Sequence, residues 1–218
     1  MKKAFTLAEI LITLGIIGVV AAITIPTVIK HHQQKVVVTR LQKFYTIINQ
    51  AIKLSEAENG NCGNWDIPDD SDINGNPYTA LEFYNTYLAN YIKSNEIELA
   101  EVTGVDGIIQ VRTVVSFADG SAMTLASNHG IVIHFYPYKS KLNNVTNPAK
   151  EQFAFSFNKI NSVEQVCSVE PYTYTWNGTR AQLISKARYG CNKTALLKNY
   201  CAKLIQYDGW KISKDYPW

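Results

Sequence analysis

Acidic and amide side chains between residues 70 and 75 have the spacing of a calcium-binding loop. Asp70, Asp72 and Asn74 alternate along the chain and a glycine follows them. In such loops alternating oxygen atoms converge on a hard cation, and the glycine permits the sharp turn. The pattern requires a closing acid where this chain has leucine, and Glu82 comes one position too late. We therefore interpret the segment as a solvated turn, with calcium as the alternative, and expect no other metal and no cofactor.

Two further patterns point toward enzyme chemistry, and both are incomplete. Ser156 and Lys159 have the S-x-x-K spacing of penicillin-binding enzymes, but the chain contains neither S-D-N nor K-T-G. His129 and His134 lack the helical i, i+4 spacing and the glutamate of a zinc protease. The sequence therefore predicts no catalytic residues and a protein that is not an enzyme.

Four cysteines lie beyond the apolar N-terminal segment, namely Cys62, Cys167, Cys191 and Cys201. None belongs to a C-x-x-C pair of the kind that zinc sites and redox motifs use. An even number on one side of a membrane anchor favours disulfides, provided that this side is extracytoplasmic. Three pairings exist. Closeness along the chain favours Cys191 with Cys201, which leaves Cys62 for Cys167, and buried free thiols are the alternative.

One carboxylate lies inside an otherwise apolar segment. From Phe5 to Ile25 there are 21 residues, and Glu9 is the only charged one. As a helix this segment is about 30 Å long, the thickness of a bilayer core. An acid inside hydrocarbon costs roughly 2.5 to 3.5 kcal/mol, so its presence indicates a function and a partner for Glu9.

Three kinds of N-terminal signal compete for this segment: a secretory signal peptide, an uncleaved signal anchor and a prepilin-type leader. A secretory signal has an uncharged apolar run that ends in a small-x-small cleavage site, whereas this run begins with an acid and ends in AAITIP. A plain anchor has no need of a buried acid. The position of Glu9 therefore favours the prepilin-type leader.

The N-terminal sequence resembles the signature of type IV pilins and type II secretion pseudopilins. It reads KKA followed by FTLAEILITLGIIGVVAAITIP. The similarity covers about residues 2–52 and combines a basic leader, Phe-Thr-Leu-x-Glu, an apolar run and a proline. In that family a prepilin peptidase of the inner membrane cuts before the phenylalanine and methylates the new N-terminus. The resemblance implies a leader of residues 1–4, cleavage between Ala4 and Phe5, and N-methylation of Phe5. The family usually has glycine where this chain has Ala4, and both residues are small.

The resemblance also implies a role for Glu9. The matching acid in the family is proposed to pair with the amino terminus of a neighbouring subunit during assembly. Such a pair offsets part of the desolvation cost of both charges and fixes the axial register between subunits. Similar proteins have glycine and proline at the positions of Gly18 and Pro26, and a proline inside a helix removes one hydrogen bond. We therefore expect a kink or local unwinding there.

A regular apolar pattern continues beyond the membrane segment. Apolar residues recur at steps of four, three, four and four, which is typical of one face of an amphipathic helix: Val37, Leu41, Phe44, Ile48 and Ile52. We expect one long helix, with a membrane-spanning or filament-core part at 5–26 and an amphipathic part at 27–60. Two helices separated at Pro26 are the alternative.

Residues 61–218 are expected to form a globular α+β head. Asp119-Gly120 predicts a hairpin within 108–125, and 131–136 and 153–157 have the composition of strands. We expect a loop at 61–79, a helix at 81–93 and two short helices after residue 180. The predicted fold is pilin-like: a long N-terminal helix packed on a small antiparallel sheet. The aromatic tail (Trp210, Tyr216 and Trp218) is expected to form a lid that packs onto the sheet.

The charge balance excludes one class of function. The formal net charge is +3, and the Lys and Arg residues are scattered rather than clustered, so we expect no nucleic-acid binding. The expected protein is a structural subunit of a type IV pilus, DNA-uptake pilus or secretion pseudopilus. Its partners would be prepilin peptidase, other subunits and the inner-membrane assembly platform. It would cross the bacterial inner membrane once, head outside the cytoplasm, and then enter a periplasmic or extracellular filament. The alternative is a membrane-anchored or fibre-tip binding or adhesion module.

Overall fold

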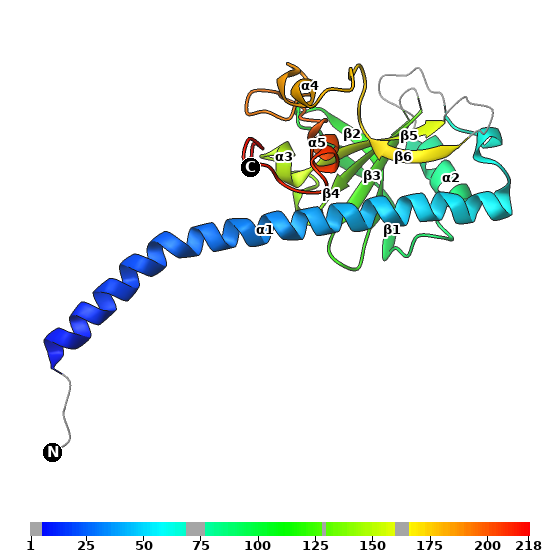
Figure 1. The fold of residues 1–218 in the computed structure, drawn as a ribbon. Helices are drawn as coiled ribbons and strands as arrows, with labels where there is room; N and C mark the ends of the chain where they lie inside the picture. Colours follow the sequence, from blue (N-terminus) through cyan, green and yellow to red (C-terminus); the bar gives the residue numbers. More distant parts are fainter. Residues whose placement is uncertain (1–5, 69–76, 128–129, 160–165) are drawn as a thin grey trace. The chain divides into compact units, whose positions relative to one another are not determined.

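The computed structural model describes residues 6–68, 77–127, 130–159 and 166–218, in two units that meet between Val37 and Val38. A single helix of 53 residues, α1 (Leu7–Asn59), begins in the first unit and ends in the second (Figure 1). It passes through Pro26 without a break, so the alternative of two separate helices does not hold. Gly60 ends the helix with a φ of +76°, the left-handed conformation common directly after a helix.

The head, from Val38 to the C-terminus, is built on an antiparallel sheet of six strands. Each strand pairs with the next along the chain, so the order in the sheet is the order in the sequence. The strands are β1 (Glu96–Thr103), β2 (Ile109–Ser116), β3 (Ala122–Ser127), β4 (Ile131–Tyr136), β5 (Phe153–Lys159) and β6 (Cys167–Pro171). The predicted α+β arrangement is confirmed, and the sheet has two strands, β1 and β6, that were not expected.

The second part of α1 packs on one face of this sheet (Figure 1). Phe44 stacks on Phe135 of β4 with ring centroids 4.5 Å apart and meets Phe155 of β5 edge-on at 5.1 Å. The predicted apolar positions of this part of the helix are all buried: Leu41, Phe44, Ile48 and Ile52. Burial of these side chains is the main force that holds the helix on the sheet.

Polar contacts fix where α1 lies along the sheet. The side-chain amide of Asn49 bonds to the backbone of Val169 as a neighbouring strand would. It accepts a hydrogen bond from the Val169 N–H and donates one to the Val169 carbonyl, both at 2.9 Å. The Tyr45 hydroxyl donates to Glu170 at 2.8 Å. The Asn49 bonds satisfy backbone groups of β6 at the outer edge of the sheet, and the Tyr45 bond holds a side chain of the same strand.

Short helices surround the sheet: η1 (Cys62–Asn64), α2 (Pro77–Tyr87), η2 (Lys139–Lys141), α3 (Pro148–Glu151), α4 (Arg180–Ser185) and α5 (Cys201–Tyr207). Helix α2 packs against β2 and β3 and lies earlier than the predicted 81–93. It begins at Pro77, whose constrained φ suits the first position of a helix. The predicted loop at 61–79 is therefore wrong at its end and also contains η1.

The aromatic tail packs onto helices of the head. Trp210 lies 5.4 Å from the ring of Tyr45 on α1. Tyr216 is buried, and its hydroxyl donates to the carbonyl of Ala149 in α3. The tail thus covers helical parts of the head, whereas a lid on the sheet was expected.

Candidate functional site

The first turn of α1 is closed by a reciprocal pair of side chains. Glu9 Oε2 accepts from the backbone N–H and the hydroxyl of Thr6, each at 2.8 Å. In return the Glu9 N–H donates to Thr6 Oγ1 at 3.3 Å. This is a capping box, with Thr6 before the first helical residue and Glu9 at the third. The T-x-x-E spacing could have revealed it from the sequence, and the sequence analysis missed it.

The capping box leaves one side of the Glu9 carboxylate available. Both bonds from Thr6 end on Oε2, and within the described part of the chain Oε1 accepts none. A carboxylate has lone pairs on both oxygens, so Glu9 can keep its cap and still accept from an external cation. Ala4 and Phe5, where cleavage and methylation are predicted, lie outside the described residues.

The remaining polar side chains of the apolar segment are satisfied inside the helix. Thr13 Oγ1 donates to the Ile10 carbonyl and Thr24 Oγ1 to the Val20 carbonyl, both at 2.9 Å. Such bonds back to the preceding turn remove free hydroxyl donors from the helix surface. A bilayer requires polar groups to be paired within the segment, and these threonines meet that requirement.

The apolar segment itself is uncovered. Its most apolar 18-residue window has a mean hydropathy of 2.4, and none of that window is buried. Leu7 is 76% exposed and Ile23 70%. By length and composition this part of α1 can cross a membrane. An exposed apolar surface of this size is normally covered by lipid or by other protein.

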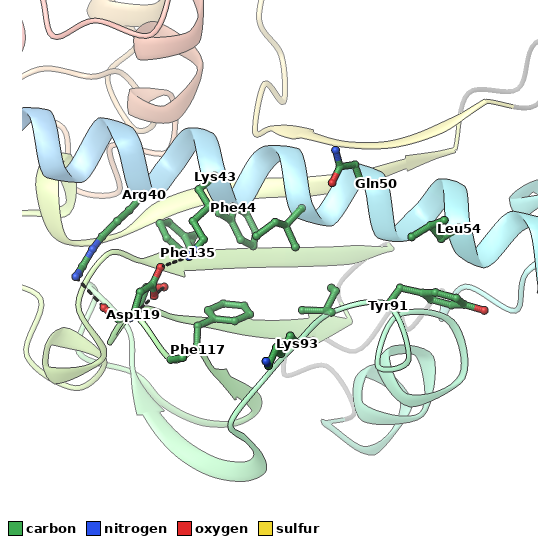
Figure 2. Close-up of a pocket in the computed structure, with 14 residues that line it drawn as sticks. Arg40, Lys43, Phe44, Gln50, Leu54, Tyr91, Lys93, Phe117, Asp119 and Phe135 are labelled. Atoms are coloured by element: carbon green, nitrogen blue, oxygen red, sulfur yellow. Dashed lines mark hydrogen bonds and ion pairs between the residues drawn. The ribbon is translucent and has the colours of Figure 1, made fainter.

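Along the head part of α1 runs a cavity of about 390 Å³, drawn in Figure 2. Phe44 and Ile47 of α1 form one wall, and Phe117 and Ile92 form the other. Leu54 extends the apolar lining and is 56% exposed. The volume suits a small ligand or inserted side chains.

Charged groups close one end of this cavity (Figure 2). Lys43 Nζ lies 2.9 Å from Asp119 Oδ2, and Ser121 donates to the other oxygen of Asp119 from its N–H at 3.1 Å. Burial alone would raise the pKa of Asp119, but the bonds from Lys43 and Ser121 lower it to about 2. Arg40 donates to the carbonyls of Pro137 and Asp119. Lys43 and Arg40 thus bond to the turn between β2 and β3, and Arg40 also bonds to the segment after β4.

The structure contains the two disulfides favoured from the sequence. Cys62 pairs with Cys167, and Cys191 pairs with Cys201, at Cα separations of 6.1 and 4.8 Å. The first joins η1, just after α1, to the edge strand β6. The second joins the segment after α4 to the start of α5.

The structure describes only some of the other candidate residues. Asp70, Asp72 and Asn74, the calcium candidates, and His129 lie outside the described residues. Ser156 lies in the middle of β5 and donates to Asn158 Oδ1 at 3.1 Å. Within the described residues no three His, Cys, Asp or Glu side chains are grouped for a metal ion.

Comparison with known proteins identifies a family. The model of a family of unknown function (DUF6613) matches residues 27–218. No curated protein and no solved structure matches the chain. The match begins just after the apolar segment and includes the whole head.

Proposed function

We propose that this chain, which belongs to the family of unknown function DUF6613, is a structural subunit of a filament of the type IV pilus or secretion pseudopilus kind. In this proposal it does no catalysis. Before assembly it spans the bacterial inner membrane with the head outside the cytoplasm. A prepilin peptidase then processes it, and it enters the filament through an assembly platform.

One observation carries the proposal: an exposed apolar helix whose single acid lies in its first turn. The segment is long enough to span a bilayer, and its window of highest hydropathy is wholly unburied. The same surface that faces lipid in a free subunit can face neighbouring helices in a filament, because both surroundings are apolar. A plain membrane anchor would account for the apolar residues and for the capping role of Glu9, but it does not require a charged residue in the apolar segment.

The geometry of Glu9 supports a role in pairing between subunits. Thr6 occupies one carboxylate oxygen, and the other is available to the ammonium group of a neighbour. Cleavage before Phe5 would create such an ammonium at the start of every subunit. Because an unpaired charge in an apolar core is costly, only the register that joins the two charges would be stable.

The processing step can be tested directly by mass spectrometry of the protein from its native membrane. The expected N-terminal peptide begins at Phe5 and carries one methyl group on its amine. Ala4→Gly is the matched variant, and we expect it to be processed at least as fast. An intact Met1 in the membrane and filament fractions would contradict the proposal and leave a simple anchor.

A further inference from the structure

A second cavity, of about 720 Å³, lies at β4, β5 and the segment that follows β6. Its lining includes Val132, Ser156, Asn158 and Tyr172. None of the described residues that line it is charged. The cavity is therefore unlike the one along α1, which has lysines at its rim.

This cavity opens on the sheet face that α1 does not cover. Phe135 and Phe155 point toward α1, as their ring contacts with Phe44 show. Side chains alternate along a strand, so Ser156, next to Phe155, points to the opposite face. Val132 is the partner of Ser156 in the pairing of β4 with β5 and shares that face. A ligand here would leave the α1 side of the head free for other contacts.

Tyrosines form one wall of the cavity. Tyr172 and Tyr174 both line it, with ring centroids 6.4 Å apart. Tyr189 supports both rings from behind, at 5.7 Å from Tyr172 and 6.4 Å from Tyr174. Tyr200 continues the cluster, 5.9 Å from Tyr189. Burial raises the pKa of Tyr172 far above its usual value, so its hydroxyl stays protonated.

The backbone holds Tyr174 out toward solvent. Its side chain is 64% exposed, although its neighbours pack against one another. The next residue, Thr175, has a φ of +60°, which is strained for a β-branched side chain. The Tyr200 hydroxyl donates to the Tyr174 carbonyl, and the adjacent Cys201 is tied to Cys191. Strained residues of this kind cluster at active sites, ligand clamps and switch regions, so the strain at Thr175 is consistent with a binding site here.

Polar groups with unused hydrogen-bonding capacity complete the lining. Ser156 donates to Asn158 Oδ1, which orients the Asn158 amide and leaves its nitrogen as a donor. Neither this nitrogen nor the Thr173 hydroxyl bonds to another described residue, and both residues line the cavity. Amide and hydroxyl groups both donate and accept, so they suit a ligand that is rich in hydroxyls.

We infer that this cavity is a binding site for a neutral saccharide. A sugar ring presents C–H bonds on one face, which pack against the electron-rich face of a tyrosine, and hydroxyls around its edge for Asn158 and Thr173. The described lining residues carry no charge that would pair with a phosphate or sulfate, and their polar groups disfavour a purely apolar ligand. The volume is within the range of small-molecule sites, about 300 to 1,000 Å³. The inference does not depend on the proposed filament function.

The test uses the full chain in nanodiscs and neutral oligosaccharides of glucose, galactose, mannose and N-acetylglucosamine as probes, measured by calorimetry. We expect saturable binding of at least one probe. Tyr174→Ala should weaken that binding by about fivefold to tenfold, and Tyr174→Phe should preserve it because the ring remains. Asn158→Ala should weaken it by a similar factor.

Tyr207→Ala is the matched control, because Tyr207 is also half exposed and does not line the cavity. It should bind as the unchanged protein does. The inference is overturned if no neutral probe binds at millimolar concentration. It is also overturned if Tyr174→Ala binds normally while circular dichroism shows an intact fold, or if sulfated oligosaccharides bind better than neutral ones.

Discussion

Thr6 and Glu9 cap the first turn of α1 for each other, through three hydrogen bonds of 2.8 to 3.3 Å. The acid that the pilin resemblance assigns to contact between subunits therefore already has a partner within its own chain. Capping and charge are two separate properties of Glu9, and substitution can separate them.

Glu9→Gln should keep the cap and lose the charge, because glutamine also serves at the third position of a capping box. We expect the variant to insert into the membrane as well as the parent does and to enter filaments at least tenfold less. Thr6→Ala should do the reverse, weakening the first turn by about 1 kcal/mol while the carboxylate remains. Immunoblots of sheared filaments and membranes measure both effects. Normal filament levels of Glu9→Gln, or of Glu9→Ala, would exclude a role for the charge.

The two disulfides should differ in their contribution to stability. They close segments with sequence separations of 105 and 10 residues. In the chain-entropy account, loss of the longer loop costs about 4.7 kcal/mol and loss of the shorter one about 2.7 kcal/mol. Urea unfolding of the double variants Cys62→Ser/Cys167→Ser and Cys191→Ser/Cys201→Ser should show this order. Equal losses of unfolding free energy would mean that residual structure in the unfolded chain, and not loop length, determines how much each disulfide contributes.

His134 should make the head sensitive to mild acid. Burial, and after it the nearby Arg112 charge, lowers the pKa of His134 to about 3 from 6.5. Below pH 6.5 the His134 imidazole binds a proton in the unfolded chain but stays neutral in the folded chain. The free energy of unfolding is therefore highest above pH 6.5, and it falls as the pH decreases from 6.5 to 3. His134→Gln should flatten this part of the curve of unfolding free energy against pH. His31→Gln, an exposed position on α1, is the control and should leave the curve unchanged.

Arg180 should hold the C-terminal tail through paired hydrogen bonds that a lysine side chain cannot make. Its guanidinium bonds to both carboxylate oxygens of Asp208, at 2.6 and 2.7 Å, and of Asp215, at 2.9 and 3.0 Å. Lysine carries the charge but lacks the planar set of donors. Arg180→Lys should therefore speed amide hydrogen exchange in residues 210–218. Arg188→Lys, at an exposed position that stacks on Tyr189, is the control. Unchanged exchange would show that the aromatic contacts of Trp210 and Tyr216 hold the tail without Arg180.

Elements with a strong local pattern were predictable from the sequence. The steps of three and four from Leu41 to Ile52 located the helix face that is buried, and Asp119-Gly120 marked the turn between β2 and β3. Gly120 has a φ of +79°, which is the reason for a glycine there. These signals are local, because backbone conformation and side-chain periodicity depend on a few neighbouring residues.

Edge elements were not predictable in the same way. Strand β1 has three glutamates among its eight residues, and β6 has only five residues, one of which is proline. Neither segment has the composition of an interior strand, and a sheet edge tolerates charge and proline because one side of it faces solvent. What makes β6 a strand is its pairing with β5 and the amide of Asn49, 120 residues away along the chain.

The sequence by itself determined the apolar segment with its single acid, the long amphipathic helix and the α+β class, since each depends on local composition and spacing. Only the tertiary structure decided that the Asn49 amide pairs with the backbone of Val169, because these two residues lie 120 positions apart in the sequence. It alone brought Tyr172, Tyr174, Tyr189 and Tyr200 together beside Asn158. Those contacts join separate strands, loops and a disulfide, and nothing in the spacing of the residues encodes them.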